Sequence, residues 1–303
     1  SLKQMAIIKQ GQAYSTIQDY GNWWTVSIAG RIGYVNKSNV SNLRWLTRNI
    51  VNPKRNYSYE QMQKDIVELR RTYPDIIQTR VIGKSVDGRD ITAVKLGKGS
   101  TEVLFNASHH AREHMTTNVL MEMIDVYAAG YRKNQKISNY NVKTVLDRVS
   151  IWFVPMVNPD GVMLVQHGHM SVSNPNQVIR INNGSRNFAA WKANVRGVDL
   201  NRQYPELWNT IRDNPGRPAP ENYRGPRALS EPESSALYNF TRSRNFKSAI
   251  SYHSSGNVIY PRFGHEQFTR SLANIVRNET GYTPIDLTSD LSGGGFTDWF
   301  IRS

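Results

Sequence analysis

The sequence contains no cysteine in its 303 residues. Disulfides and thiolate metal sites are therefore excluded, and any zinc ion in this chain has to be held by histidine and carboxylate side chains. The sequence also has no run of eighteen apolar residues, which excludes a membrane-spanning helix. It begins at Ser1 and not at methionine, which predicts a processed or trimmed chain that has already lost any signal peptide.

Acidic residues are also scarce, since 24 aspartates and glutamates face 38 lysines and arginines and leave a net charge of +14. A charge of this size favours anionic surroundings, of which nucleic acid, a membrane surface and an anionic cell wall are the candidates. The basic residues are spread along the chain and form no single block, which argues against nucleic acid. The length of 303 residues predicts one large domain, or a large domain with a small companion, and the 39% of apolar residues is ample for a core of ordinary size.

Short strand-like segments with turn signals between them characterise residues 1–46. Residues 6–8, 24–28 and 33–35 are predicted strands. The segment from Asn22-Trp-Trp-Thr-Val26 to Gly33-Tyr-Val35 resembles the end of a bacterial SH3-like domain, which implies a small all-β barrel that binds the cell wall. The alternative is a small β-hairpin packed on the main domain.

Strands that alternate with helices characterise the rest of the chain. The capping box Ser58-Tyr-Glu-Gln61 predicts a helix that ends before Pro74. Strands are expected at 79–83, 91–96, 102–107, 149–155 and 249–253, with Asp87-Gly88 as a hairpin signal between the first two and a helix at 118–131.

The later part of the chain is less regular. The stretch 162–229 is rich in Asn, Gly, Pro and Arg and is expected to be irregular, and Ser230-Glu-Pro-Glu233 is a second predicted capping box. Because strands alternate with helices, the sequence predicts an α/β domain with a largely parallel sheet.

Two of the predicted strands end in histidine. Residues 103–107 run into a segment with three imidazoles, a carboxylate and a guanidinium, and residues 249–252 run into His253. His110 and Glu113 are three positions apart, so one turn can direct both toward one ion. Ligands of open α/β sheets bind at the carboxyl ends of strands. His110, Glu113 and His253 are therefore predicted to hold one zinc ion and to leave a fourth position for water, as in a catalytic site.

One alternative uses a different pair of histidines. His110-Ala-Arg-Glu113-His114 also fits the H-x-x-E-H pattern, in which both histidines bind zinc and the glutamate is the base. That pattern requires a helix, whereas the residues before His110 read as a strand. It also leaves His253 without a role, so His109 and His114 are expected to support the site or to lie in the core.

Four ordered motifs carry a resemblance to a known family. The chain from about residue 57 onward is similar to the zinc carboxypeptidases typified by carboxypeptidase A, and within them to the bacterial γ-D-glutamyl-diaminopimelate peptidases. The segments Trp191-Lys-Ala-Asn194 and Gly293-Gly-Gly-Phe-Thr-Asp298-Trp299 suggest that branch. The four motifs are His110-Ala-Arg-Glu113, Asn158-Pro-Asp-Gly161, Gly197-Val-Asp-Leu-Asn-Arg202 and Ser251-Tyr-His-Ser254.

The resemblance implies a mixed central sheet with helices on both faces over residues 55–303. It also implies roles for individual residues. Asp199 orients a ligand imidazole, Asn201 and Arg202 bind the terminal carboxylate of the substrate, and Arg112 lines the adjacent subsite. Thr297 lies where the family reads the side chain of the leaving residue.

The chain departs from the family pattern at three places. Lys192 stands where the family has an arginine that stabilises the oxyanion, which makes it a candidate for that role without a bidentate fork. Asp290 stands where the family has a mobile tyrosine, and Phe296 in the nearby loop has no hydroxyl. No carboxylate after His253 matches the general-base glutamate, and the chain stops at Ser303, which predicts a C-terminally truncated form of an active enzyme.

The expected function is hydrolysis of the γ-D-glutamyl-diamino acid amide of peptidoglycan stem peptides by one zinc ion. Expected partners are these peptides and an anionic cell wall, without nucleic acid or a membrane span, and the expected location is outside a Gram-positive-type bacterium or on its wall. One alternative is a general zinc exo-carboxypeptidase acting on protein C-termini. Another is a wall-binding protein that keeps the zinc site but has no catalytic base.

Overall fold

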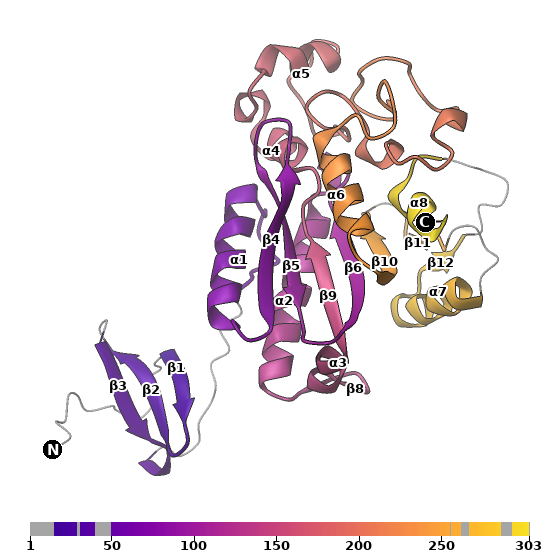
Figure 1. The fold of residues 1–303 in the computed structure, drawn as a ribbon. Coiled ribbons are helices and arrows are strands. Elements are labelled where there is room, and N and C mark those ends of the chain that lie inside the picture. Colours follow the sequence, from indigo (N-terminus) through magenta and orange to yellow (C-terminus); the bar gives the residue numbers. More distant parts are fainter. Residues whose placement is uncertain are drawn as a thin grey trace. The chain divides into compact units, whose positions relative to one another are not determined.

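The computed structural model describes residues 15–28, 31–39, 50–254, 256–261, 267–285 and 293–302. The chain divides into two compact units, Ser1–Arg48 and Asn49–Ser303. Figure 1 shows the fold of each unit. Among the described residues, no helix has the length and apolar character that a membrane span needs.

The described part of the small unit is a three-stranded antiparallel sheet. Strands β1 (Ser15–Tyr20), β2 (Trp23–Ile28) and β3 (Arg31–Asn36) pair in chain order, and a 3₁₀ turn (Lys37–Asn39) follows. The predicted strands around Trp24 and Gly33 are confirmed, while the strand predicted at 6–8 lies outside the described residues. The three strands form a small sheet and do not by themselves amount to the predicted barrel.

A mixed five-stranded sheet forms the centre of the large unit, in the order β10-β6-β9-β5-β4 (Figure 1). β10 (Phe246–Tyr252), β6 (Thr101–Ala107) and β9 (Val149–Val154) run parallel. β5 (Asp90–Leu96) and β4 (Ile77–Lys84) form the predicted hairpin and pair antiparallel. The mixed sheet implied by the family resemblance is confirmed.

Helices cover both faces of this sheet because successive strand residues point to opposite sides. Ile151 and Phe153 of β9 pack with α1 (Tyr59–Thr72), α2 (Met115–Arg132) and α3 (Val142–Arg148). Trp152 and Val154 face the other core, which contains residues of α6 (Pro232–Arg242) and α8 (Phe296–Arg302). Both faces of the sheet are therefore buried.

The two predicted capping boxes have different outcomes. Ser58 caps α1 as predicted, since its side chain accepts a hydrogen bond from the Gln61 amide. The second prediction is wrong, because α6 begins at Pro232 after Glu231, and no side chain caps it. The Ser230 hydroxyl instead donates to the side-chain oxygens of Gln203 and Glu231.

The stretch 162–229 is more ordered than predicted. It contains most of α4 (Pro159–His167), all of α5 (Pro175–Ile181), and the 3₁₀ turns His169–Ser171, Leu200–Arg202 and Trp208–Thr210. The missed signal is an asparagine followed by proline. Asn158 and Asn174 each cap a helix through the side-chain oxygen, and the next residue is a proline in the first turn.

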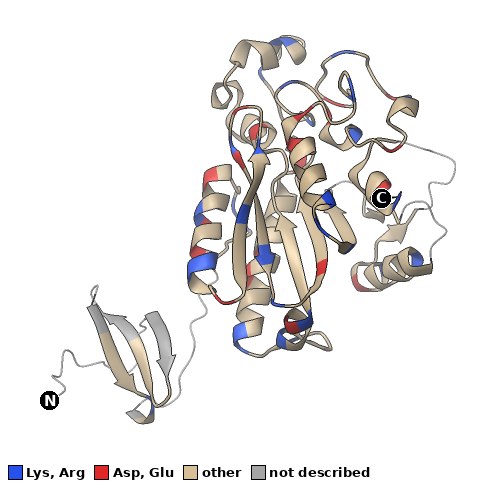
Figure 2. Cartoon of the chain, viewed as in Figure 1, with Lys and Arg blue, Asp and Glu red and all other residues tan. Residues whose placement is uncertain are grey.

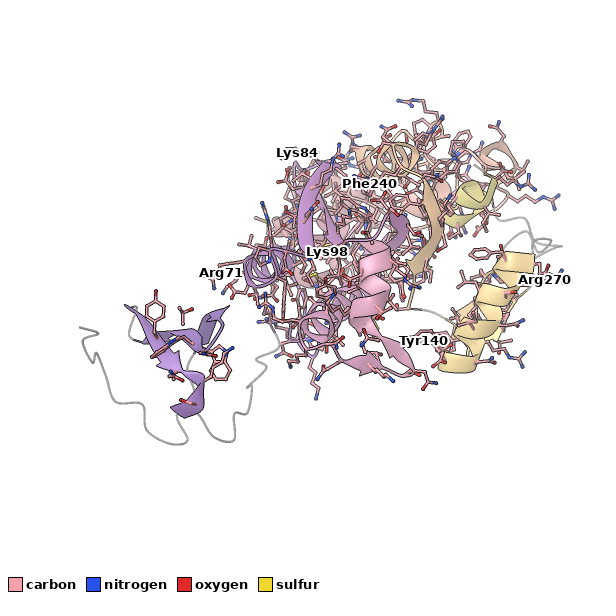
Figure 3. All side chains as sticks on the ribbon, turned by 60° about the horizontal axis from the view of Figure 1, so that its bottom comes forward. Arg71, Lys84, Lys98, Tyr140, Phe240 and Arg270 are labelled. Atoms are coloured by element: carbon pink, nitrogen blue, oxygen red, sulfur yellow. The ribbon has the colours of Figure 1, made fainter. Side chains whose placement is uncertain are left out.

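The remaining elements lie at the periphery of the large unit. β7 (Lys136–Ile137) and β8 (Tyr140–Asn141) form a hairpin whose Tyr140 is exposed (Figure 3). β11 (Val258–Ile259) pairs with β12 (Thr283–Pro284), beside α7 (Gln267–Thr280). Lysines and arginines are scattered over many elements of this unit, as the sequence indicates (Figure 2).

Candidate metal centre

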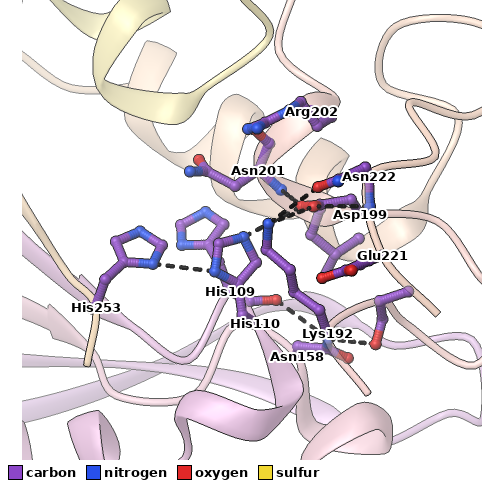
Figure 4. Close-up of polar contacts among 12 residues, drawn as sticks. His109, His110, Asn158, Lys192, Asp199, Asn201, Arg202, Glu221, Asn222 and His253 are labelled. Carbon is purple, nitrogen blue, oxygen red and sulfur yellow. Dashed lines mark hydrogen bonds and ion pairs between the residues drawn. The ribbon is translucent and has the colours of Figure 1, made fainter. Parts of the chain in front are cut away.

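The carboxyl ends of β6 and β10 bring the predicted zinc ligands together. The two strands are parallel neighbours, and Tyr252 of β10 is the register partner of Ala107 of β6. His253 follows β10 directly, and His110 follows β6 by three residues. Parallel strands end at the same edge of a sheet, so the pairing that builds the core also places these imidazoles side by side (Figure 4).

The turn between β6 and His110 is held in a strained conformation. Ser108 has a φ of 52°, in the left-handed region that non-glycine residues rarely adopt. Its amide donates to the Thr116 hydroxyl over 3.0 Å, and its hydroxyl lies 2.9 Å from that of Thr117. Strain of this kind persists where surrounding contacts fix the backbone, and here it turns the chain so that His110 follows the strand end.

The three predicted ligands converge on one point. His110 Nδ1 lies 3.0 Å from Glu113 Oε1 and 3.1 Å from His253 Nδ1, and His253 Nδ1 lies 2.7 Å from Glu113 Oε2. One atom from each residue lies within 4.8 Å of the others. Two ligands bound at about 2.0–2.1 Å to one tetrahedral zinc ion are about 3.3 Å apart, so these separations fit zinc.

The chemistry of the donors also fits a cation. Two imidazole nitrogens that face each other at 3.1 Å cannot both act as acceptors without a positive charge between them. Burial lowers the pKa of His253, which favours the neutral ligand form. Burial acts to raise the pKa of the Glu113 carboxyl, but the adjacent imidazoles of His110 and His253 outweigh it and hold that pKa well below its usual range.

The imidazole of His110 also contacts a buried carboxylate. Asp199 is fully buried, and its Oδ1 lies 3.2 Å from His110 Nε2. Although burial acts to raise the pKa of Asp199, the charges of His110, Lys192 and Arg202 hold it well below its usual range. An ionised carboxylate in this position fixes the imidazole tautomer and turns Nδ1 toward the ligand cluster.

The pair predicted to bind the substrate carboxylate follows Asp199 on a 3₁₀ turn. Asn201 Oδ1 accepts a 3.0 Å hydrogen bond from the Phe296 amide, which leaves the donor end of that side chain for another partner. Arg202 Nη1 donates to the Asn201 carbonyl at 3.2 Å, while its Nε is buried without a hydrogen-bond partner among the described residues. Both side chains therefore keep donors that suit an anionic group.

The other predicted site residues have different surroundings. Arg112 Nη1 donates to the Ala190 carbonyl at 3.0 Å and lies 3.3 Å from Glu221 Oε2. The Lys192 ammonium lies 3.2 Å from both Asp199 Oδ2 and Asn222 Oδ1 (Figure 4). Thr297 is partly buried in the first turn of α8.

The residues named as departures or alternatives are also placed by the structure. Phe296 begins α8 and is fully buried, so it is a core residue and not part of an open loop, while Asp290 lies outside the described residues. His109 is buried with Nε2 3.0 Å from the Tyr204 hydroxyl. His114 is not a member of the ligand group, and Ala111–Glu113 is a single 3₁₀ turn, which disfavours the H-x-x-E-H alternative.

Two asparagines at the site were not assigned a role from the sequence. Asn158 Nδ2 donates to the carbonyls of His109 and Ala193 at 3.1 Å each and so ties the ligand turn to the Lys192 segment. The sequence shows the motif that contains Asn158, but these two hydrogen bonds depend on the fold. Asn222 contacts Asp199 and Lys192 from a loop more than twenty positions away, and no local pattern marks it.

Comparisons with known proteins agree with this geometry. Residues 62–292 match the family model described as zinc carboxypeptidase. The chain is 36% identical over 263 residues to gamma-D-glutamyl-L-diamino acid endopeptidase 1 of Lysinibacillus sphaericus, covering 85% of this chain and 65% of that protein. It is 27% identical to human mast cell carboxypeptidase A, over 75% of this chain and 55% of the relative.

The fold agrees as well. Bovine thrombin-activatable fibrinolysis inhibitor superposes with a TM-score of 0.64 at 20% identity, over 82% of this chain and 83% of that one. The chain spans 65% and 55% of the lengths of the two curated relatives.

Proposed function

The chain belongs to the zinc carboxypeptidase family, and we propose that it hydrolyses the amide between γ-D-glutamate and a diamino acid in peptidoglycan stem peptides. The observation that carries the reaction class is the convergence of His110, Glu113 and His253 at the ends of two parallel strands. The substrate class rests on the likeness to a γ-D-glutamyl-diamino acid endopeptidase over 85% of the chain.

His110, Glu113 and His253 would hold the zinc ion, which when bound acidifies a water molecule and polarises the scissile carbonyl. Asp199 would keep His110 in the tautomer that offers Nδ1, because its Oδ1 faces Nε2. The Phe296 amide holds the oxygen of the Asn201 side chain, so the Asn201 amino group is the end that would meet the substrate.

Arg202 and Asn201 would bind the free α-carboxylate of the diamino acid. Among the described residues the Nε of Arg202 is buried without a hydrogen-bond partner, which favours an anionic partner, and a carboxylate supplies two acceptors. Arg112 would meet a second carboxylate of the substrate, although Glu221 at 3.3 Å offsets part of its charge. Thr297, small and uncharged, would line the site of the leaving residue.

Attachment to the wall would come from the small unit and the overall charge. The sheet of β1–β3 supports an SH3-like wall-binding module, and the net charge of +14 suits an anionic polymer. On this proposal the protein acts outside a Gram-positive-type bacterium or on its wall. Release of single residues from protein C-termini is the competing function, since the family also contains exo-carboxypeptidases such as the mast cell enzyme.

Competition between two substrates separates these functions. The zinc-loaded protein is given the tripeptide L-Ala-γ-D-Glu-diaminopimelate together with an L-peptide of ordinary sequence, and both cleavage and binding are measured. We expect preferential binding of the tripeptide, since no carboxylate after His253 matches the general base that cleavage requires. Release of C-terminal residues from the L-peptide, with the tripeptide neither bound nor cut, would contradict the proposed substrate.

A further inference from the structure

The charge of Lys192 is directed at Asp199. Its ammonium lies 3.2 Å from Asp199 Oδ2 and donates to Asn222 Oδ1 at 3.2 Å, and the side chain is only 12% exposed. An oxyanion donor has to point its charge at the reacting carbonyl. Here the ammonium is the counter-ion of a buried carboxylate instead.

Asp199 connects this ammonium to the metal centre. One carboxylate oxygen faces Lys192 and the other lies 3.2 Å from Nε2 of the ligand His110 (Figure 4). A carboxylate behind a ligand imidazole makes that imidazole a stronger donor to the metal. A cation on the far oxygen withdraws negative charge from the carboxylate and therefore weakens this effect.

We propose that Lys192 is a positioning residue that acts through Asp199 and lowers the donor strength of His110, and that it is not the oxyanion donor suggested by the sequence. This inference rests on the proposed zinc chemistry. Weaker donation from His110 leaves more positive charge on the ion, so the zinc binds less tightly but acidifies its water more strongly. Lys192 would thus lower the affinity for zinc and raise the reactivity of the water that zinc activates.

Backbone hydrogen bonds hold the Asp199 carboxylate independently of Lys192. Its Oδ1 accepts a 3.0 Å hydrogen bond from the Asn201 amide, and its Oδ2 accepts one of 3.3 Å from the Asn222 amide. These donors belong to the backbone and persist when the lysine side chain is replaced. Replacement of Lys192 is therefore expected to change the charge on the carboxylate more than its position.

Zinc affinity is the direct readout, measured by competition with a chelator and without substrate. We expect Lys192→Met to bind zinc about three- to tenfold more tightly than the original protein, less than the 10- to 100-fold effects of direct outer-shell partners. Lys192→Arg keeps the charge and is expected to retain the original affinity within about twofold. Lys84→Met is the matched control, because Lys84, the last residue of β4, is exposed and pairs with Asp90 of β5 (Figure 3).

A double-mutant cycle tests the route through Asp199. In an Asp199→Asn background the carboxylate is absent, so Lys192→Met is expected to cause little further change in zinc affinity. An equal change in both backgrounds would mean that Lys192 acts without Asp199. If Lys192→Met alone folds poorly, Lys192→Gln removes the charge but keeps a hydrogen-bond donor for the buried carboxylate, and it takes the place of Lys192→Met in the cycle.

Each outcome decides one of the two proposals. If the original protein binds no zinc, the proposed function fails, and the inference about Lys192, which rests on it, is overturned with it. If it binds zinc, and Lys192→Met leaves the affinity unchanged or weaker while thermal unfolding shows a folded chain, the inference about Lys192 is wrong and the proposed function stands.

Discussion

At the scale of single residues, the main feature of this protein is a set of buried carboxyl side chains. Asp199, Glu231 and Glu233 are all buried, and each is compensated differently. Asp199 faces the Lys192 ammonium and the His110 imidazole and stays ionised. Glu233 accepts hydrogen bonds from the Val86 amide and the Asn194 side chain, without a cation partner among the described residues. Burial, with the charges of Asp160 and Glu231, raises the pKa of Glu233 to about 8. A buried carboxyl group is therefore expected to carry charge at position 199 and a proton at position 233.

Glu233 is expected to make the free energy of unfolding depend on pH. Its folded pKa of about 8 lies above the ordinary value of 4.5, so its favourable contribution is complete below about pH 4.5 and is lost as the pH rises through 8. We expect Glu233→Gln to remove this dependence. Between pH 6 and pH 9 the free energy of unfolding of the original protein should fall relative to the variant by about 2–3 kcal/mol.

Urea unfolding at the two pH values measures this difference, and any pH-independent cost of the glutamine cancels. Glu68→Gln is the matched control, because Glu68 pairs with Arg71 on the exposed face of α1 and should leave the pH dependence as it is. Parallel stability curves for Glu233→Gln and the original protein would show that Glu233 is ionised throughout.

At the scale of secondary-structure elements, the site forms where strands and short turns end. The metal ligands follow the ends of β6 and β10, and the predicted carboxylate-binding pair lies on the 3₁₀ turn Leu200–Arg202. Residues 293–295, called the glycine turn here, precede α8 and pack against that pair. The strand ends could be predicted from the sequence, because an apolar run followed by histidine is a local pattern. The contact between the glycine turn and Arg202 could not, since the two are more than ninety positions apart.

The glycine turn is expected to set the position of Arg202. Gly294 has a φ of +68°, and a Cβ there would lie 2.8 Å from the Arg202 carbonyl oxygen. Gly294→Ala should therefore lower stability by about 2–4 kcal/mol, from backbone strain plus overpacking, and weaken binding of a substrate carboxylate.

Gly281→Ala separates strain from contact, because Gly281, at the end of α7, has a φ of +72° but open space around the added methyl group. This control should lose about 1 kcal/mol and bind substrate normally. Equal stability losses and equal substrate affinities for the two variants would refute a positioning role for the glycine turn.

At the scale of the whole molecule, the sequence predicted the large unit better than the small one. Local patterns indicated the five sheet strands, two of the three helices on one face, and both strand ends that carry histidine. The stretch 162–229 was read as irregular because its helices α4 and α5 are short and marked by asparagine and proline. The contacts of Lys192 with Asp199 and Asn222 depend on loops that only the fold brings together.

The two units are expected to have different roles: residues 1–48 bind the wall, and residues 49–303 bind the metal. A chain that starts at Asn49 should keep its zinc affinity but sediment less with purified peptidoglycan. Sedimentation is compared at about 0.15 M and 0.5 M salt, because salt screens the general attraction of a basic protein to an anionic wall. Equal sedimentation of both chains at high salt would exclude a wall-binding role for the small unit.

The metal content of the purified protein tests the central claim most directly. We expect one zinc ion per chain, and we expect His253→Ala to lose it because only His110 and Glu113 of the ligand group remain. His167→Ala is the matched control, since His167 ends α4 and lies outside the ligand group. A protein without zinc, or one whose zinc content is the same after His253→Ala as after His167→Ala, would contradict the account.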